Sequence, residues 1–185
     1  MSSSCQIPSG RDKPIEDALC SLPAWYAVHT RSRHEKQVST QLEIRGVNTF
    51  LPLVKQVRHW SDRRKVVELP LFPGYSFVRV GSSPEDQVRV LRIDGVVAFV
   101  GIRGRGIPIP EKQIEDIRQL LMQNVPCVNH PFLRVGRRVR IRGGALDGVT
   151  GILIDKQGDH RLVISVEPIE RSFSIRLEGY DVEVL

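Results

Sequence analysis

Cysteines are few in this sequence, and they follow no recognisable pattern. Among the 185 residues only Cys5, Cys20 and Cys127 are cysteines, and no two of them have Cys-x-x-Cys spacing. Zinc sites and disulfide frameworks need closely spaced or paired cysteines. We therefore expect neither, and the composition fits a protein of the reducing cytoplasm.

Long apolar runs are also missing. Nowhere do about 18 consecutive apolar residues occur, which is roughly the length that spans a membrane as a helix. The N-terminus lacks the apolar segment of a signal peptide. Hydrophobic residues make up 41% of the chain and charged residues 26%, as is typical of globular proteins. We expect no membrane partner.

The sequence contains no familiar catalytic motif. Its five histidines are scattered, and neither a Gly-x-Ser-x-Gly element nor a Walker loop is present. The glycines at positions 101, 104 and 106 do not have the Gly-x-Gly-x-x-Gly spacing of dinucleotide-binding proteins, and this stretch predicts a flexible loop instead. These absences favour a binding protein without cofactor or metal over an enzyme.

Positive charge is in excess, but it is unevenly distributed. The whole chain has a net charge of +6. Residues 24–123 hold 16 lysines and arginines against 10 aspartates and glutamates, whereas residues 132–185 hold 9 against 8. Basic surfaces attract anionic partners such as nucleic acids. The first half of the chain is therefore the expected place of any nucleic-acid contact.

Turn-forming residues and periodicity divide the chain into four segments. Residues 1–23 are rich in serine and proline and predict a disordered tail. Residues 24–123 alternate strand and helix patterns. Residues 124–131 contain two prolines and no periodicity, which indicates a linker. Residues 132–185 combine short strand patterns with glycines, and they predict a small β-barrel.

Three helices are predicted in the first half. Ser32 followed by Glu35 predicts a capping box for the first helix, which ends before Gly46. Ser83 predicts the N-cap of the second, and the third covers residues 111–123. The side chains expected to face inward are His34, Val38 and Leu42 in the first helix, Val88 and Leu91 in the second, and Ile114, Ile117 and Leu121 in the third.

A basic hairpin is predicted after the first helix. Residues 47–60 form a predicted strand interrupted at Pro52, and residues 66–69 return as its partner. Cations at the tip could bind phosphates while a base stacks on Trp60. Alternatively, they keep an exposed sheet edge soluble. The cations of this tip and of the first helix start are Arg31, Arg33, Lys36, Arg58, Arg63, Arg64 and Lys65.

The strand predicted at residues 75–80 carries a different chemistry on each face. Side chains alternate along a strand, so Ser76, Val78 and Val80 share one face and suit packing under a helix. The other face carries Tyr75, Phe77 and Arg79. Aromatic and arginine side chains are enriched in protein interfaces. Burial of both aromatics in the core is the alternative, and composition alone favours it.

The order of these patterns resembles that of bacterial NusG-type transcription factors. The resemblance is carried by residues 25–28 (Trp-Tyr-Ala-Val), by residues 69–78 (Leu-Pro-Leu-Phe-Pro-Gly-Tyr-Ser-Phe-Val), and by residues 135–141 with the glycines after them. It implies an α+β fold. Residues 24–123 would form the N-terminal (NGN) domain, an antiparallel sheet flanked by helices, and residues 132–185 an SH3-like KOW barrel.

Two stretches are most similar to the specialised UpxY-type antiterminators. They are residues 30–36 (Thr-Arg-Ser-Arg-His-Glu-Lys) and residues 68–74 (Glu-Leu-Pro-Leu-Phe-Pro-Gly). Members of that subfamily act on particular operons, often those for surface polysaccharides. The resemblance therefore implies an operon-specific antitermination factor.

The resemblance also implies a mechanism and a set of contacts. NGN domains bind the clamp helices of the RNA polymerase β′ subunit, keep the clamp closed and suppress pausing, and their basic residues lie near the non-template DNA strand. The cations named above match that role. We expect the chain to be a monomer. The positions that match the polymerase contact are Phe72, Pro73, Tyr75, Phe77 and Phe99.

The KOW segment departs from the common family pattern in its first turn. Residues 144–148 read Gly-Ala-Leu-Asp-Gly, where general family members often carry Gly-Pro-Phe. KOW domains of the family bind a ribosomal protein or the termination factor Rho, and the departure leaves that partner open. Closely set glycines oppose a helical form of this segment. The matching motif positions are Val139, Ile141, Gly144, Leu146, Gly148, Gly151 and Ile152.

A second function is compatible with the same sequence. KOW barrels also occur in ribosomal proteins, so the chain could be an RNA-binding or ribosome-associated protein. The excess of positive charge lies outside the predicted barrel, which counts against this alternative.

Overall fold

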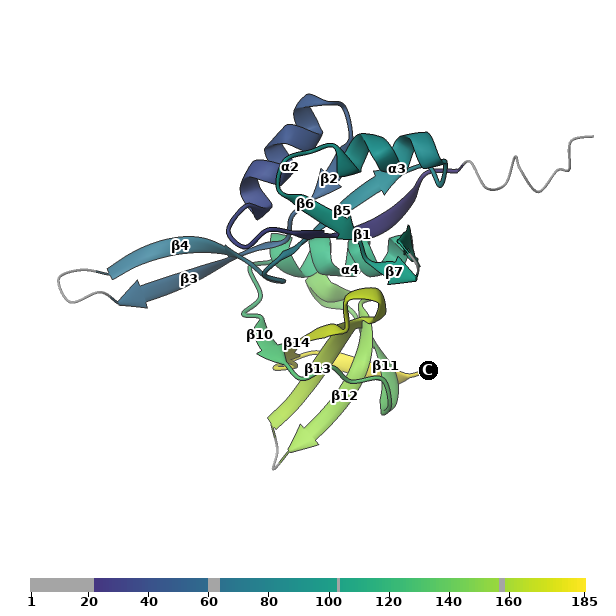
Figure 1. Ribbon diagram of the computed structural model, residues 1–185. Helices are drawn as coiled ribbons and strands as arrows, with labels where there is room; N and C mark the ends of the chain where they lie inside the picture. The colour runs from purple at the N-terminus through teal and green to yellow at the C-terminus, as the bar shows by residue number, and fades with distance from the viewer. Residues whose placement is uncertain (1–21, 60–63, 103, 157–158) are drawn as a thin grey trace, which may run out of the picture.

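The computed structural model describes residues 22–59, 64–102, 104–156 and 159–185, which form a mixed α/β structure. Two β-rich halves lie on opposite sides of one helix, α4 (Glu111–Met122) (Figure 1). The disordered tail predicted for residues 1–23 falls almost entirely outside the described residues. The α+β fold class predicted from the sequence is confirmed.

The N-terminal half is built on an antiparallel sheet with the order β2-β5-β1-β6, and β9 also pairs with β1. Its centre is the pairing of β1 with β5, in which Ala27 lies opposite Phe77 and His29 opposite Tyr75. The strands are β1 (Ala24–Thr30), β2 (Asn48–Phe50), β5 (Tyr75–Val80), β6 (Val96–Phe99) and β9 (Pro108–Ile109).

Two helices, α2 (Glu35–Ile44) and α3 (Pro84–Leu91), cover one face of this sheet. Val38 and Leu42 of α2 are fully buried, as their spacing predicts. They pack with Val78 and Val80, which confirms the small-residue face of β5. The opposite face is covered by α4, whose Ile114, Ile117 and Leu120 join Trp25, Ala27 and Phe77 in a second apolar cluster.

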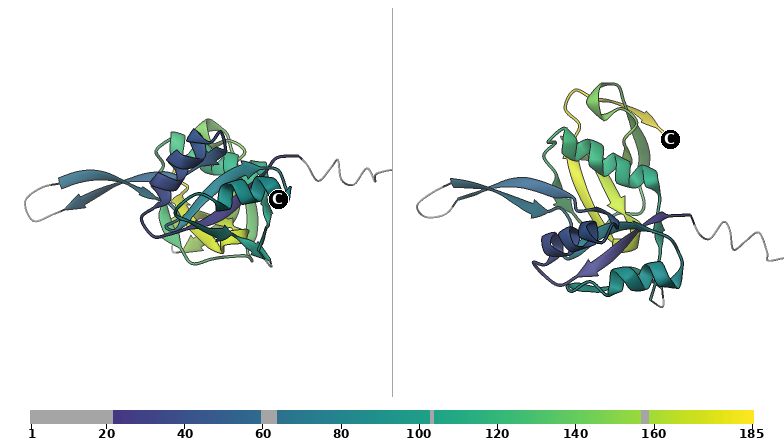
Figure 2. Two further views of the ribbon diagram at one scale, coloured as in Figure 1. Left: turned by 45° about the horizontal axis from the view of Figure 1, so that its top comes forward. Right: turned by 90° about the horizontal axis from the view of Figure 1, so that it is seen from above.

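The strands β3 (Leu53–His59) and β4 (Arg64–Pro70) form a hairpin that projects away from the rest of the molecule in all views (Figures 1 and 2). The predicted interruption at Pro52 is confirmed, because β2 ends at Phe50 and β3 begins at Leu53. Pro52 lacks the N–H that a continuous ladder would need.

The C-terminal half is a six-stranded antiparallel sheet, called the C-terminal sheet below, with the order β10-β14-β13-β12-β11-β15. Two short 3₁₀ turns, η1 (Gly144–Leu146) and η2 (Glu167–Ile169), interrupt it. The strands predicted after residue 132 are all present. They are β11 (Arg137–Arg142), β12 (Thr150–Lys156), β13 (Asp159–Val166), β14 (Arg171–Arg176) and β15 (Asp181–Val184), and the sheet contains β10 (Val128–His130) in addition.

The segment predicted as a linker is partly structured. Residues 128–130 form β10, in which Asn129 pairs with Phe173 of β14. The predicted linker therefore includes a short strand. Periodicity cannot be recognised over three residues, and the backbone pairing comes from the tertiary fold.

The capping box predicted for the first helix does not form. The helix begins at Glu35, and His34, its N-cap, makes no side-chain capping hydrogen bond. The Glu35 carboxylate is buried and accepts a hydrogen bond of 2.8 Å from the backbone N–H of Gly74 instead. A tertiary hydrogen bond with the turn before β5 thus replaces the local hydrogen bond of a capping box.

The cap of α3 is as predicted, with the Ser83 hydroxyl accepting from the N–H of Asp86 at 3.2 Å.

The inward face of α3 differs from the prediction. Val88 and Leu91 are each 41% exposed, whereas Val90 and the following Ile93 are buried. Both pairs have i, i+3 spacing, so the sequence pattern could not separate them. In α4, Leu120 rather than Leu121 is fully buried.

The stretch predicted as a flexible loop forms a short hairpin. Its strands are β7 (Gly101–Ile102) and β8 (Arg105–Gly106), and Gly101 lies opposite Gly106. A Cβ atom on Gly101 would lie 1.8 Å from the carbonyl oxygen of Arg105, so this close pairing requires glycine. Among the described residues, no helix is both long and apolar enough to cross a membrane.

Candidate functional site

The aromatic residues predicted on the Phe-Pro-Gly-Tyr stretch gather on the α4 face of the sheet. Phe77 packs edge-to-face against Phe72, with ring centroids 6.0 Å apart, and stacks on Phe50 at 6.1 Å. Phe72 and Phe77 are only 2% and 0% exposed. Tyr75 is half-buried beside His29, and Pro73 is exposed. Only the edge of this aromatic surface is therefore accessible.

Phe99 does not belong to the same surface. It lies opposite Val28 in the pairing of β1 with β6, so it points to the face under α2 and α3. There its ring meets Tyr26 edge-to-face, with centroids 5.9 Å apart. The five predicted contact residues thus divide into a group of four and one residue on the far side of the sheet. Sequence alternation alone could not reveal this, because it does not relate one strand to another.

Two elements cover the aromatic surface. Arg118 of α4 lies over the rings of Trp25 and Phe50, with its guanidinium carbon 5.0 and 4.9 Å from their centroids. From the C-terminal sheet, Phe173 contacts Phe72 edge-to-face at 5.9 Å. The apolar cluster is therefore continuous from the N-terminal half into the C-terminal half.

The predicted cations at the first helix start are exposed and already near carboxylates. Arg31 forms an ion pair with Asp94 at 3.1 Å, and Lys36 lies 3.9 Å from Glu68. Arg33 is exposed and has a positive φ of 66°. Exposed pairs of this kind contribute little to stability, so these cations remain available to an anionic partner.

The basic hairpin places further cations far from the body of the molecule. Arg64 and Lys65 of β4 are exposed, and the strand register puts Lys65 opposite Arg58. Exposed lysine and arginine side chains suit contact with the phosphates of an anionic partner. Arg63 and Trp60, the predicted base-stacking residue, lie outside the described residues, as does the Arg58 side chain.

The predicted KOW motif residues build the C-terminal sheet and its first turn. Val139, Ile141 and Leu146 are fully buried, and Ile152 is 7% exposed. Gly144 and Gly148 have φ values of 70° and 85°. A Cβ atom on Gly151 would lie 2.6 Å from the carbonyl oxygen of Val163. The apolar residues of the motif therefore pack in the interior, and its glycines allow the tight turn and the close strand contact. None of the apolar side chains forms an exposed patch.

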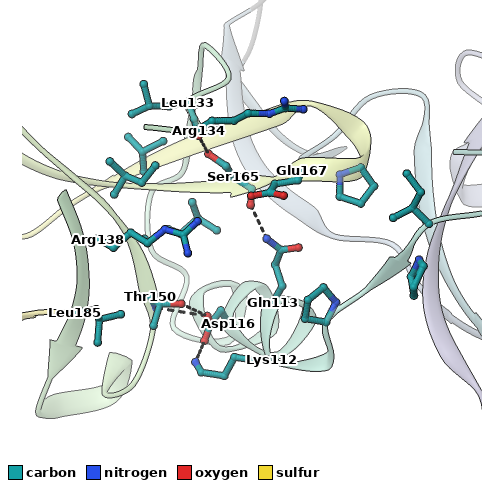
Figure 3. Close-up of a pocket in the computed structure, with 18 residues that line it drawn as sticks. Lys112, Gln113, Asp116, Leu133, Arg134, Arg138, Thr150, Ser165, Glu167 and Leu185 are labelled. Carbon is teal, nitrogen blue, oxygen red and sulfur yellow. Dashed lines mark hydrogen bonds and ion pairs between the residues drawn. The ribbon is translucent and has the colours of Figure 1, made fainter. Parts of the chain in front are cut away.

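A pocket of about 620 Å³ lies between α4 and the C-terminal sheet (Figure 3). On its α4 side, Asp116 accepts hydrogen bonds from Thr150, and Gln113 donates to the carbonyl oxygen of Ser165. Sequence reasoning missed these residues, because polar side chains on an amphipathic helix are expected to face solvent. Only the burial of Asp116, which is 3% exposed, marks it as unusual.

The described residues contain no cluster of histidine, cysteine or acidic side chains that could hold a metal ion. Cys127 is half-buried, and burial raises the pKa of its thiol to about 11. The thiol is therefore protonated at neutral pH, whereas nucleophilic cysteines need a lowered pKa.

Comparison with known proteins agrees with this architecture. Residues 23–118, more than half of the chain, match the family described as "Transcription termination factor nusG". The chain is 28% identical over 173 residues to the transcription termination/antitermination protein NusG of Halalkalibacterium halodurans, covering 86% of this chain and 97% of that protein. The identity to the protein of the same name from Lactococcus lactis is 28% over 171 residues, covering 86% and 91%.

A solved structure has a similar fold. It is described as "Domain interaction in Thermotoga maritima NusG" and shares 23% identity, with a TM-score of 0.50, covering 87% of this chain and 96% of that one. At this identity the likeness concerns the fold alone, whereas the family follows from the sequence matches. The chain belongs to the NusG family of transcription termination and antitermination factors.

Proposed function

We propose that this protein binds RNA polymerase at the clamp helices of the β′ subunit and suppresses pausing or termination. The observation that supports the proposal is the aromatic surface of Phe72, Pro73, Tyr75 and Phe77, the residues that the sequence resemblance matches to the family's polymerase contact. Pro73 and Tyr75 at its edge are accessible, as a first contact requires. Phe99, on the other face of the sheet, is not part of this site.

The proposal assigns a separate role to each half of the chain. Residues 24–123 act as the NGN domain, residues 124–131 connect the halves, and residues 132–185 act as the KOW domain, which recruits a ribosomal protein or Rho. The protein works as a clamp that binds the elongating state better than the paused one. A preference of about 1.4 kcal/mol shifts such an equilibrium tenfold.

The proposed target is a small set of operons rather than all transcription. Support comes from the two UpxY-like stretches, which in the structure lie together: Glu35 of the first accepts a hydrogen bond from Gly74 of the second. Lys36 and Glu68 connect the same two stretches by an ion pair. The two stretches that resemble the subfamily are thus in contact with each other beside the proposed polymerase site.

The first prediction concerns the accessible edge of the aromatic surface. Tyr75→Ala should weaken binding of the full chain to core RNA polymerase by about tenfold or more, because aromatic anchors dominate interface energy. Fluorescence anisotropy with labelled protein measures the dissociation constant. Val97→Ala on β6, where Val97 is 54% exposed, is the matched control. Equal affinity of the Tyr75 variant and the wild type would remove this surface from the contact.

The second prediction concerns the basic hairpin. The double change Arg64→Ala and Lys65→Ala should weaken binding to single-stranded DNA. It should also reduce the slope of log K against log salt concentration by about 1 to 1.5, because binding with two fewer phosphate contacts releases fewer counterions. Arg89→Ala on α3, together with Arg92→Ala at the C-cap of that helix, removes the same charge from other exposed positions. If both double variants change the salt dependence equally, net charge rather than the hairpin accounts for binding.

A further inference from the structure

The pocket between α4 and the C-terminal sheet has the size and the lining of a small-molecule site. Its volume is about 620 Å³. Ligand pockets usually measure about 300–1,000 Å³ and combine an apolar lining with a few polar groups. Ile107 and Pro108 line this pocket from the N-terminal half, whereas Leu133, Ile152 and Val163 line it from the other half. None of the residues of the proposed polymerase contact lines it, so that contact does not explain the pocket.

Most polar side chains of the pocket already have partners. Asp116 accepts a hydrogen bond of 3.1 Å from the hydroxyl of Thr150 and forms an ion pair with Lys112, so its charge is compensated. Arg134 forms an ion pair with Glu170 at 3.3 Å. These side chains therefore hold the walls of the pocket in place, and their hydrogen bonds and ion pairs do not require a ligand.

Arg138 of β11 is the exception among the basic residues of the pocket. Its side chain extends from the sheet into the pocket (Figure 3), and it has no ion-pair or hydrogen-bond partner among the described residues. Glu167 of η2 also lines the pocket, but it is exposed and forms no ion pair with Arg138. A guanidinium offers a planar fork of N–H donors that matches a carboxylate or a phosphate. The free cation of the pocket is thus suited to an anion.

The first turn of α4 adds to this preference. Pro110, Lys112 and Gln113 line the pocket, and the N-cap Pro110 makes no side-chain capping hydrogen bond. The positive end of the helix dipole favours negative charge near the first turn. Glu111, the acidic residue of that turn, forms an ion pair with Arg79 at 3.1 Å and does not line the pocket. Positive potential therefore reaches the pocket from both of its walls.

We propose that this pocket binds a small organic anion with an apolar body. The carboxylate or phosphate group of the ligand pairs with the guanidinium of Arg138, and its apolar body lies against Leu133 and Ile152. An inorganic ion alone would leave the apolar walls uncovered, and a neutral apolar molecule would leave Arg138 without a partner. Both parts of the ligand are therefore needed. The inference goes beyond the proposed function and does not rest on it.

Isothermal titration calorimetry of the full chain tests the proposal with two aromatic anions, 2-naphthyl phosphate and 2-naphthoate. At least one of them should bind with a dissociation constant below about 1 mM, as expected of a fragment-sized ligand in a partly apolar pocket. The comparison of the two distinguishes a phosphate from a carboxylate. Inorganic phosphate and 2-naphthol each carry only one part of the ligand, so both should bind at least about tenfold more weakly.

Variants of β11 locate the binding. Arg138→Ala should weaken binding of the tighter probe by about tenfold or more, because a charge-assisted hydrogen bond is lost. Arg138→Lys keeps the charge without the planar fork and should lose only part of the affinity. Arg137→Ala is the matched control, since Arg137 is exposed on the same strand and does not line the pocket. It should change the affinity by less than about twofold, because exposed charges are screened by salt.

Three outcomes would overturn the proposal. Absence of binding by both aromatic anions would mean that the pocket is not a site for this class of ligand. Equal effects of Arg138→Ala and Arg137→Ala would remove Arg138 from the contact. Binding of 2-naphthol as tightly as of the two anions would mean that the pocket is an apolar cavity without preference for an anion. Polymerase is absent from these measurements, so each outcome leaves the proposed function unaffected.

Discussion

Phe77→Ala should lower the free energy of unfolding by about 3–5 kcal/mol, the range for loss of a buried phenylalanine ring. Phe77 has no exposed surface and packs between Phe50 and Phe72, while Ala27 lies opposite it on β1. Truncation leaves a cavity at the point where the sheet meets the rest of the apolar cluster. Urea denaturation of the full chain measures the change.

The control for this prediction is Val97→Ala in strand β6 of the same sheet. Val97 is 54% exposed, so its truncation should cost less than about 1 kcal/mol. A comparably small loss for Phe77→Ala would mean that its ring is not enclosed as the structure has it. The expected result also means that weaker polymerase binding by a Phe77 variant would not by itself locate the contact, whereas Tyr75 and Pro73 can report on it.

Gly95→Ala is the second change with a large expected effect, a destabilisation of about 3 kcal/mol. Gly95 has a φ of 95°, and a Cβ atom there would lie 2.8 Å from Cγ2 of Val38 and 3.3 Å from Cβ of His34. Its carbonyl oxygen accepts from the N–H of Arg31, so the backbone cannot move without loosening the connection to β1. Thermal unfolding followed by circular dichroism measures the loss.

Gly46 provides a matched control, because it separates backbone strain from steric conflict. Its φ is 73°, but a Cβ atom there would meet no atom within 4 Å. Gly46→Ala should therefore cost only the strain of the left-handed conformation, about 1 kcal/mol. Equal losses for the two variants would show that the packing of α2 against residue 95 contributes nothing.

Local patterns in the sequence predicted most of the fold. Alternation along residues 75–80 separated the Val78 face from the Phe77 face, and the break at Pro52 marked where the hairpin begins. The Ser83 cap was predicted because it depends on residues three positions apart. In each case the determining contacts lie within one element.

Features that depend on distant contacts were not predictable in the same way. Glu35 appeared as half of a capping box, but it binds the N–H of Gly74, which is 39 residues away. Phe99 was grouped with Phe77 by the family resemblance, although the strand register places it on the other face. Asp116 looked like an exposed helix residue, and only its partner Thr150 in the other half explains its burial.

The burial of the aromatic surface is the most consequential of these long-range features. Composition alone favoured core positions for Tyr75 and Phe77, whereas the family resemblance favoured a contact with polymerase. In this structure Phe77 is buried and Tyr75 is half-buried, with Phe173 of the other half contacting Phe72. The burial of Phe77 agrees with the first interpretation, and the accessible part of Tyr75 agrees with the second.

One measurement tests the polymerase contact most directly. A photoreactive benzoylphenylalanine in place of Pro73, an exposed residue beside the aromatic surface, is irradiated in the full chain with core RNA polymerase. The proposed function predicts a crosslink to the β′ clamp helices. The same probe at Val97, exposed on β6, should give none. Absence of a β′ crosslink from position 73 would contradict the account.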